Sequence, residues 1–492
     1  MKLIYYTILV LLAIACANNS NVIANDTKTA KVTFSFDDEL LSKGNLRLEV
    51  SLFSHFYITA IDLYDEKYRY AVEDKNIAFN IPLEQDISVI KVELFLDDVP
   101  VLFFLPASAY LIEPEDNLSF QLGKKITLGG VGNEKNIIRE RIAGVNRRMT
   151  LGWLDYYIQS GDISMYYAVR NDFYNAMIAS KVQLLDLKRQ KISDNVYDYI
   201  KDECVYFTES MRINPMVSSV EPGAPYQQLL KEHVVLEFDA SIRKRMGSAG
   251  KSYAYTNYLT DVFVAKYFME KYIEDPESVP LIYLNEIYEE VIKFDLDDET
   301  KDKVTAFLFS RLGTKAINGE EVIEKALDRV VNTRIKSYLE DIKKRRYSNA
   351  DVYPFRLEDV NGNIYTPESF RGKKIILDFW FDGCTGCALL HKELVKIEQQ
   401  INDPSIMFIS VNVDVNRERW HRGMASGKYT SEGGVNLRVI DPQPNMVSYY
   451  GFIAFPQVLV VDTQGKLVSY DPPRPINAEG RRGFIELLTK VD

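Results

Sequence analysis

The chain has 492 residues, which is enough for about three domains of ordinary size. Hydrophobic residues make up 46% of it and charged residues 26%, as in a typical globular protein. Its formal net charge of -11 argues against a nucleic-acid partner, because phosphate binding requires a basic surface.

The first fifteen residues predict a signal segment, in which one lysine precedes an apolar run too short to span a bilayer as a mature helix. The run ends in LAIAC, which resembles the lipobox of bacterial lipoproteins, with Ala13 where that family usually has Leu. The resemblance implies cleavage before Cys16, lipidation of Cys16 as a membrane anchor, and a flexible tether over residues 16–31. Cleavage by ordinary signal peptidase, giving a soluble product, is the alternative. Either route predicts a protein of the periplasm or cell envelope.

Residues 32–132 alternate apolar and polar side chains in short runs, separated by Asp, Asn, Gly and Pro. A period of two is typical of strands with one buried face, so we expect an antiparallel β-sandwich-like domain. The end of this region, from Tyr110 to Asn136, resembles the N-terminal β-domain that precedes thioredoxin domains in exported proteins of Bacteroidetes-type bacteria. The expected strands are residues 32–36, 46–53, 57–64, 77–81, 87–96, 101–105 and 118–122.

Residues 133–348 have apolar side chains at helical spacing, so we expect an α-helical middle region. Cys204 lies in this region and is predicted to be a buried structural thiol, because a free cysteine packs as a small hydrophobe. The acidic run from Asp295 to Thr300 lacks the glycine of a calcium-binding EF-hand loop. We interpret that run as a turn leading into a capped helix.

Residues 349–492 alternate strand and helix patterns, which is typical of an α/β domain. A hairpin with Asn361-Gly362 at its turn comes first, followed by a buried strand over residues 373–381. The later expected elements are a helix over 384–400, a strand over 405–414, a helix around Trp420, a segment ending at 441, a helix over 447–450, a hairpin pair over 457–470 and a helix from 478.

Two of the four cysteines, Cys384 and Cys387, lie three positions apart directly behind the buried strand. At the start of a helix, unpaired backbone N–H groups and the helix dipole stabilise a thiolate. We therefore predict that Cys384 attacks a disulfide and that Cys387, one turn further in, resolves the mixed disulfide. This redox pair would need no other cofactor and no metal. A zinc site would require two more ligands, and haem attachment would require His where the chain has Ala388.

Three further residues resemble marks of the thioredoxin family. Asp378 matches the buried aspartate that relays a proton to and from the resolving cysteine, Trp380 the tryptophan beneath the motif, and Pro456 the cis-proline that faces the disulfide. Residues 351–492 resemble the exported TlpA/ResA-like thioredoxins, and the whole chain resembles their multidomain Bacteroidetes relatives. The resemblance implies a thioredoxin-like fold, thiol:disulfide oxidoreductase activity on disulfide-containing client proteins, and a membrane thiol reductase as electron donor.

The sequence departs from the family pattern at positions that bear on the substrate. Gly383 replaces the tryptophan that usually precedes the first cysteine, and Phe455 stands before Pro456 where Thr or Val is common. We expect the backbone around Phe455-Pro456 to hold the substrate strand. No cation lies between the two cysteines to stabilise the thiolate, which favours a reductase over a strong oxidant.

Two polar residues close to the pair are interpreted as ordinary solvent-facing residues. His391 lies one helical turn after Cys387, and Asp382 lies in the loop before Cys384. Tuning of the cysteine pair is the alternative for each. For the whole chain, the alternative function is an envelope binding or scaffold lipoprotein with a vestigial thioredoxin domain, because the first two thirds carry no catalytic signature that we identify.

Overall fold

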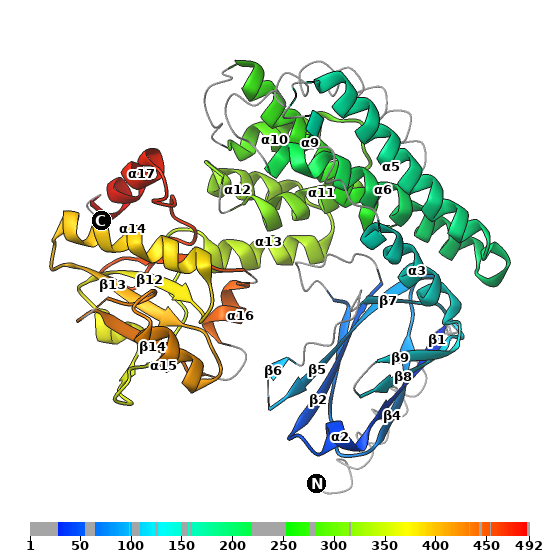
Figure 1. Ribbon diagram of the computed structural model, residues 1–492, viewed down its shortest axis with the longest axis horizontal. Coiled ribbons are helices and arrows are strands. Elements are labelled where there is room, and N and C mark those ends of the chain that lie inside the picture. The colour runs from blue at the N-terminus through cyan, green and yellow to red at the C-terminus, as the bar shows by residue number, and fades with distance from the viewer. Residues whose placement is uncertain are drawn as a thin grey trace, which may run out of the picture. The chain divides into compact units, whose positions relative to one another are not determined.

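The fold is described from a computed structural model (Figure 1). The predicted signal segment, Cys16, most of the tether, and the expected strands over residues 57–63 and 101–105 lie outside the described residues. The structure describes residues 28–54, 64–97, 99–100, 109–123, 126–148, 156–157, 160, 162–218, 252–274, 282–313, 316–431, 433–441, 445–452 and 454–489.

The described chain divides into two compact units, and each is considered by itself. The first contains the β-domain, helix α3 (Glu134–Arg148) as far as Gly144, and residues Leu184–Tyr197. The second contains most of the remaining helical region and the C-terminal α/β domain. The predicted fold class is confirmed, because sheets, helices and an α/β domain follow one another in that order.

The N-terminal domain is a sandwich of two sheets. One sheet has the order β4-β1-β8-β9, and the other has the order β3-β2-β5-β6 with β7 also paired to β5. β1 is antiparallel to β4 but parallel to β8, so the first sheet is mixed. The elements are β1 (Thr29–Phe36), α2 (Asp38–Leu41), β2 (Leu46–Phe53), β3 (Glu66–Ala71), β4 (Asn76–Pro82), β5 (Ser88–Leu96), β6 (Val99–Pro100), β7 (Ala109–Ile112), β8 (Asn117–Leu122) and β9 (Thr127–Val131).

Alternate residues of the strands fill the space between the two sheets, as the period-two pattern predicts. Phe34 of β1 stacks on Phe120 of β8 with ring centroids 4.8 Å apart, and both are buried. Leu48 and Val50 of β2 face them from the other sheet in the same core cluster. This apolar layer accounts for the sandwich.

Strand β3 was not among the expected strands, because its sequence EKYRYA is charged. The two cations of β3 are compensated across the sheet by Glu49 of β2, whose side chain is largely buried. Lys67 lies 3.4 Å and Arg69 3.0 Å from the Glu49 carboxylate. A strand with this composition is recognisable only once its neighbour is known.

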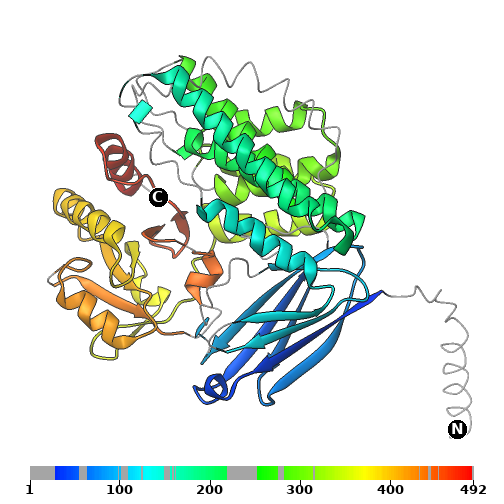
Figure 2. The same cartoon turned by 45° about the vertical axis from the view of Figure 1, so that its right-hand side comes forward.

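The middle region is helical, as predicted (Figures 1 and 2). Cys204 lies in α6 with 1% of its surface exposed, which confirms the buried thiol. Asp297 caps α11 by accepting a hydrogen bond from the Thr300 backbone N–H at 2.8 Å, as the acidic run predicts. The helices after α3 are α5 (Ile163–Asp186), η1 (Arg189–Lys191), α6 (Asp194–Ser218), α9 (Tyr253–Glu274), α10 (Leu284–Lys293), α11 (Asp298–Arg311), α12 (Gly319–Arg329) and α13 (Thr333–Arg346).

The C-terminal domain has a mixed sheet in the order β11-β10-β14-β13-β12-β15-β16. Its central strand β12 is parallel to β13 and antiparallel to β15. The expected helices and strands of this domain are confirmed. They are β10 (Leu357–Glu358), β11 (Ile364–Tyr365), η3 (Pro367–Phe370), β12 (Lys374–Trp380), α14 (Thr385–Ile401), β13 (Ile406–Asn412), α15 (Arg417–Ala425), β14 (Val435–Val439), α16 (Met446–Tyr450), β15 (Gln457–Val461), β16 (Leu467–Ser469) and α17 (Ala478–Thr489).

Both faces of this sheet are covered, which is why β12 is buried along its whole length. On one face, Ile376 packs with Leu394 of α14 and Phe484 of α17. On the other face, Leu377 packs in the cluster that contains Tyr450 of α16. The alternation along β12 directs Ile376, Asp378 and Trp380 toward the α14 face.

Candidate active site

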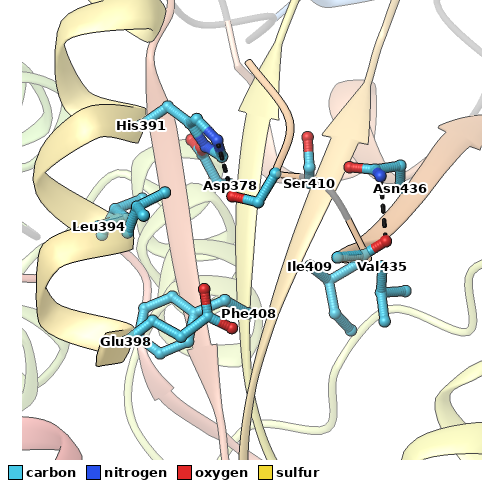
Figure 3. Close-up of a pocket in the computed structure, with 12 residues that line it drawn as sticks. Asp378, His391, Leu394, Glu398, Phe408, Ile409, Ser410, Val435 and Asn436 are labelled. Atoms are coloured by element: carbon cyan, nitrogen blue, oxygen red, sulfur yellow. Dashed lines mark hydrogen bonds and ion pairs between the residues drawn. The ribbon is translucent and has the colours of Figure 1, made fainter. Parts of the chain in front are cut away.

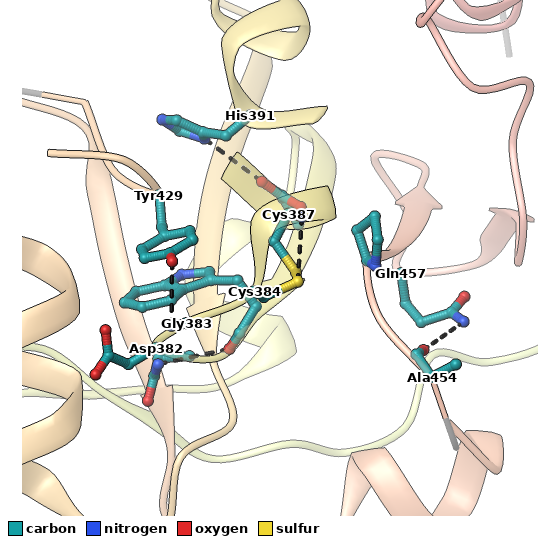
Figure 4. Close-up of a disulfide and its surroundings, with 12 residues drawn as sticks. Asp382, Gly383, Cys384, Cys387, His391, Tyr429, Ala454 and Gln457 are labelled. Carbon is teal, nitrogen blue, oxygen red and sulfur yellow. Dashed lines mark hydrogen bonds and ion pairs between the residues drawn. A yellow bond between two sulfur atoms is a disulfide. The ribbon is translucent and has the colours of Figure 1, made fainter. Parts of the chain in front are cut away.

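The two predicted redox cysteines lie at the start of α14 and form a disulfide, with Cα atoms 5.3 Å apart (Figure 4). Cys384 is the N-cap residue of the helix, and its Sγ accepts a hydrogen bond from the Cys387 backbone N–H at 3.1 Å. Cys384 is 6% exposed and Cys387 is 1% exposed. The residues beside Cys384, Gly383 and Thr385, are exposed. Cys384 is therefore the residue of the pair that lies nearer the surface.

The loop before the first cysteine is held by Tyr429 and by helix α15. The Gly383 backbone N–H donates to the Tyr429 hydroxyl at 3.1 Å (Figure 4). Gly383 has a φ of +98°, a conformation that favours glycine. The Asp382 carboxylate accepts a hydrogen bond from Arg422 Nε at 2.8 Å and is only 17% exposed. The interpretation of Asp382 as a solvated carboxylate was therefore wrong, because Arg422 comes from a helix 40 residues later.

Trp380 lies in the cluster beneath the disulfide, with 1% of its surface exposed. Its ring stacks on Tyr429 at a centroid distance of 4.6 Å, and its Nε1 donates to Ser410 Oγ at 2.6 Å. A Cβ at Gly423 of α15 would lie 2.5 Å from the indole, so only glycine allows the helix to approach this closely. These contacts fix the Trp380 ring in place beneath the cysteine pair.

The Phe455-Pro456 peptide bond is cis, as the resemblance implies. A Cβ built on Gly386 would lie 3.2 Å from Pro456 Cδ, which places the proline against the segment between the two cysteines. The Phe455 ring meets the Phe381 ring edge to face at a centroid distance of 5.8 Å. The loop around Ala454 and Gln457 stands opposite the disulfide (Figure 4). Pro456 and Phe455 therefore lie beside the cysteine pair.

Asp378 lies on β12, on the face covered by α14, and is 5% exposed. Neither of its carboxylate oxygens has a hydrogen-bond partner among the described residues. Burial raises the pKa of Asp378 above its ordinary value, and the charge and contact of His391 oppose that rise. A buried carboxyl with a raised pKa is suited to taking up and returning a proton.

His391 is not the exposed helix residue that the sequence suggested. Its side chain is 13% exposed, and its Nδ1 lies 3.5 Å from Asp378 Oδ2 (Figure 3). Its Nε2 lies 3.4 Å from Ser431 Oγ. The spacing along α14 placed His391 correctly one turn after Cys387, but it could not show that β12 and the segment before β14 meet that face of the helix.

A small cavity of about 30 Å³ adjoins Asp378 and His391 (Figure 3). That volume exceeds the roughly 10–15 Å³ that one water molecule requires. Ser410, Ser431 and Glu398 also line the cavity, so it has polar as well as apolar walls. Burial raises the pKa of Glu398, and the charge of His391 again opposes the rise.

Residues 348–479 match a protein-family model described as Redoxin. The C-terminal domain is a thioredoxin-like, oxidoreductase-type domain of the Redoxin family. No curated protein matches the chain.

Solved structures are similar to part of the chain. The thioredoxin domain of a thiol-disulfide oxidoreductase from Bacteroides vulgatus is 22% identical, covers 28% of this chain and 98% of its own, and has a TM-score of 0.25. A thiol:disulfide interchange protein from a Bacteroides species is 23% identical, covers 29% of this chain and 91% of its own, and has a TM-score of 0.24.

The Redoxin domain brings together every predicted site residue except Cys16, which lies outside the described residues. Within the described ranges, no group of three or more His, Cys, Asp or Glu side chains is arranged to hold a metal ion. In the same part of the chain, no helix has both the length and the apolar character needed to cross a bilayer.

Proposed function

We propose that the protein is a thiol:disulfide oxidoreductase of the periplasm or cell envelope, working as a reductase through Cys384 and Cys387. The observation that supports this most strongly is the disulfide at the tip of α14. The two sulfurs are close enough to join, and the first cysteine is the more exposed of the pair. Both properties are needed for a cycle in which one sulfur meets the substrate and the other stays enclosed.

The proposed reaction begins with both cysteines reduced and Cys384 as the thiolate. Its sulfur attacks a substrate disulfide, so a bond forms to one substrate sulfur while the other leaves as a thiolate and is protonated. Cys387 then loses its proton and attacks Cys384. The Cys384–Cys387 bond forms, the bond to the substrate breaks, and the second substrate thiol leaves. Two electrons pass from the dithiol to the substrate, and an external dithiol must restore them.

Three features of the site fit these steps. The Cys387 backbone N–H donates to Cys384 Sγ, so the helix start can stabilise the attacking thiolate. The Asp378 carboxylate takes the proton of Cys387, which a buried group with a raised pKa can also give back. The backbone at Phe455-Pro456 lies beside the pair and binds the substrate strand.

The proposed partners follow from the same chemistry. The substrates are proteins with accessible disulfides, and the electron donor is a membrane thiol reductase. No metal and no cofactor beyond the Cys384–Cys387 pair takes part. The apolar N-terminal run ending in LAIAC supports export and attachment to the membrane through lipidated Cys16.

A Cys384→Ser variant tests the proposed activity. We expect it to lose at least about 10³-fold in turnover of insulin disulfides with dithiothreitol as reductant, because the hydroxyl is a far weaker nucleophile. Cys204→Ala is the matched control, since Cys204 is a buried thiol in α6, outside the Redoxin domain, and it should retain wild-type turnover. Equal turnover by wild type and Cys384→Ser would instead favour a scaffold protein with a vestigial thioredoxin domain.

A Cys16→Ser variant tests the anchor. When cells that express the wild type are grown with a radiolabelled fatty acid, the protein should carry the label and be found in the membrane fraction. The variant should carry no label and should leave the membrane fraction. A wild-type protein that is exported but unlabelled would identify ordinary signal peptidase as the processing enzyme.

A further inference from the structure

We propose that His391 is a positioning residue for the resolving step, carrying the proton between buried Asp378 and solvent. The inference rests on the proposed function, because it concerns the proton that Cys387 must lose before it attacks Cys384. It adds a residue that the sequence pattern had placed in solvent.

The His391 ring lies between Asp378 and Ser431. Nδ1 faces Asp378 Oδ2 at 3.5 Å, and Nε2 faces Ser431 Oγ at 3.4 Å. Both distances exceed an ordinary hydrogen bond, but a carboxylate and an imidazolium at this separation still attract each other strongly where water is scarce. The ring is therefore held between the buried carboxylate and a hydroxyl on another segment.

Asp378 has little direct contact with bulk water, so a neighbour that reaches the surface helps it to exchange protons. It is 5% exposed, and its oxygens have no hydrogen-bond partner among the described residues. His391 has 13% of its side chain exposed, so part of it reaches the surface. Imidazole is the side chain best suited to bind and release a proton near neutral pH.

The cavity beside the pair provides the route. At about 30 Å³ it can hold a water molecule within reach of both side chains. No lysine or arginine is among the described residues that line it, so the charge that acts on the carboxylate there is that of His391. The ionisable and polar side chains that face the cavity are Asp378 from β12, His391 and Glu398 from α14, Ser410 from β13, Ser431 from the segment before β14, and Asn436 from β14.

Removal of the His391 side chain is expected to slow the resolving step near neutral pH. The imidazolium favours the ionised form of Asp378, so its loss leaves the carboxyl protonated to higher pH. Fewer molecules then carry a base that can accept the Cys387 proton near neutrality. The resolving step should slow there and recover at alkaline pH, whereas the first attack by Cys384 should be unaffected.

The test follows the two steps separately in the full chain. Reduced protein is mixed with one equivalent of 5,5′-dithiobis(2-nitrobenzoate), which releases one coloured thiol when Cys384 attacks and a second when Cys387 resolves. We expect His391→Gln to slow the second release about tenfold near neutral pH and by progressively less as the pH is raised, with the first release unchanged. Glutamine keeps a polar side chain of similar size but cannot carry the proton.

Two controls separate this role from a structural one. His421→Gln changes an exposed histidine of α15 in the same domain and should leave both phases unchanged. In an Asp378→Asn background, His391→Gln should cause no further slowing, since it acts through the carboxylate. Equal slowing at every pH, added slowing in that background, or a wild-type profile for His391→Gln would each overturn the inference. A wild type that releases no second thiol would instead refute the proposed function.

Discussion

A Cys387→Ser variant is expected to accumulate a covalent complex in which Cys384 is disulfide-bonded to a substrate protein. The attack by Cys384 does not need the second sulfur, so the first step proceeds. Resolution does need it, and a thiol held next to the reacting bond has an effective concentration of the order of 10⁵ M or more. Without that thiol, the mixed disulfide should live at least about 10³-fold longer than in the wild type.

The complex is measured by expressing the variant in its native cell envelope, quenching with acid and separating proteins without reductant. Bands of higher mass should appear that collapse on reduction, and mass spectrometry should place the linkage at Cys384. The double variant Cys384→Ser/Cys387→Ser is the matched control and should form none. Bands that persist in the double variant, or a linkage to Cys204, would contradict the assignment of Cys384 as the attacking residue.

An Asp378→Asn variant is expected to be more stable than the wild type at neutral pH, by about 1–3 kcal/mol. The reason is the burial of a carboxylate whose contact with His391, at 3.5 Å, is longer than an ordinary hydrogen bond. Asparagine has the same shape without the charge, so it removes the cost of burying an ion. The variant should resolve mixed disulfides more slowly, because the amide cannot accept the Cys387 proton.

The stability difference between the two proteins should depend on pH. Burial raises the pKa of Asp378 in the folded state, so the native protein keeps this proton at pH values where the unfolded chain has lost it. Wild-type stability therefore falls as pH rises from the ordinary carboxyl pKa of about 3.9 through the raised value. The asparagine variant lacks this fall, so the stability difference should be smallest below about pH 4 and should grow as the pH rises above it.

Denaturant unfolding of the two oxidised proteins at a series of pH values provides the measurement. Because the chain has several domains, both proteins carry Trp153→Phe, so that the fluorescence of the two remaining tryptophans, Trp380 and Trp420, which are buried in the C-terminal domain, reports its transition. A lower stability of Asp378→Asn at pH 7, or a difference that does not change with pH, would show that the carboxylate is compensated by contacts beyond those described.

The C-terminal domain could be predicted from sequence because its signals are local. The strand that ends at Trp380, the cysteine pair and the start of α14 lie within a few consecutive residues, and the structure places them as expected. The environments of Asp382 and His391 could not be predicted in this way. Arg422 and Ser431 reach them from segments 40 residues away, and only the sheet order β12-β13-β14 brings those segments together.

In the β-domain too, contacts between separate segments could not be predicted from sequence. Strands with alternating apolar residues, such as β1 and β2, were found, because each carries its own core-facing pattern. β3 was missed, because what stabilises its lysine and arginine is Glu49 on the neighbouring strand. Contacts between neighbouring strands involve two separate segments. They cannot be predicted from the residue pattern of one segment alone.

The low exposure of Cys384 limits which molecules an enzyme of this kind can reach. Only 6% of the residue's surface is open, and Pro456 stands close by against Gly386. A partner sulfur must therefore come close to the start of α14 before it can react. A protruding or extended segment meets that demand more readily than a flat surface does.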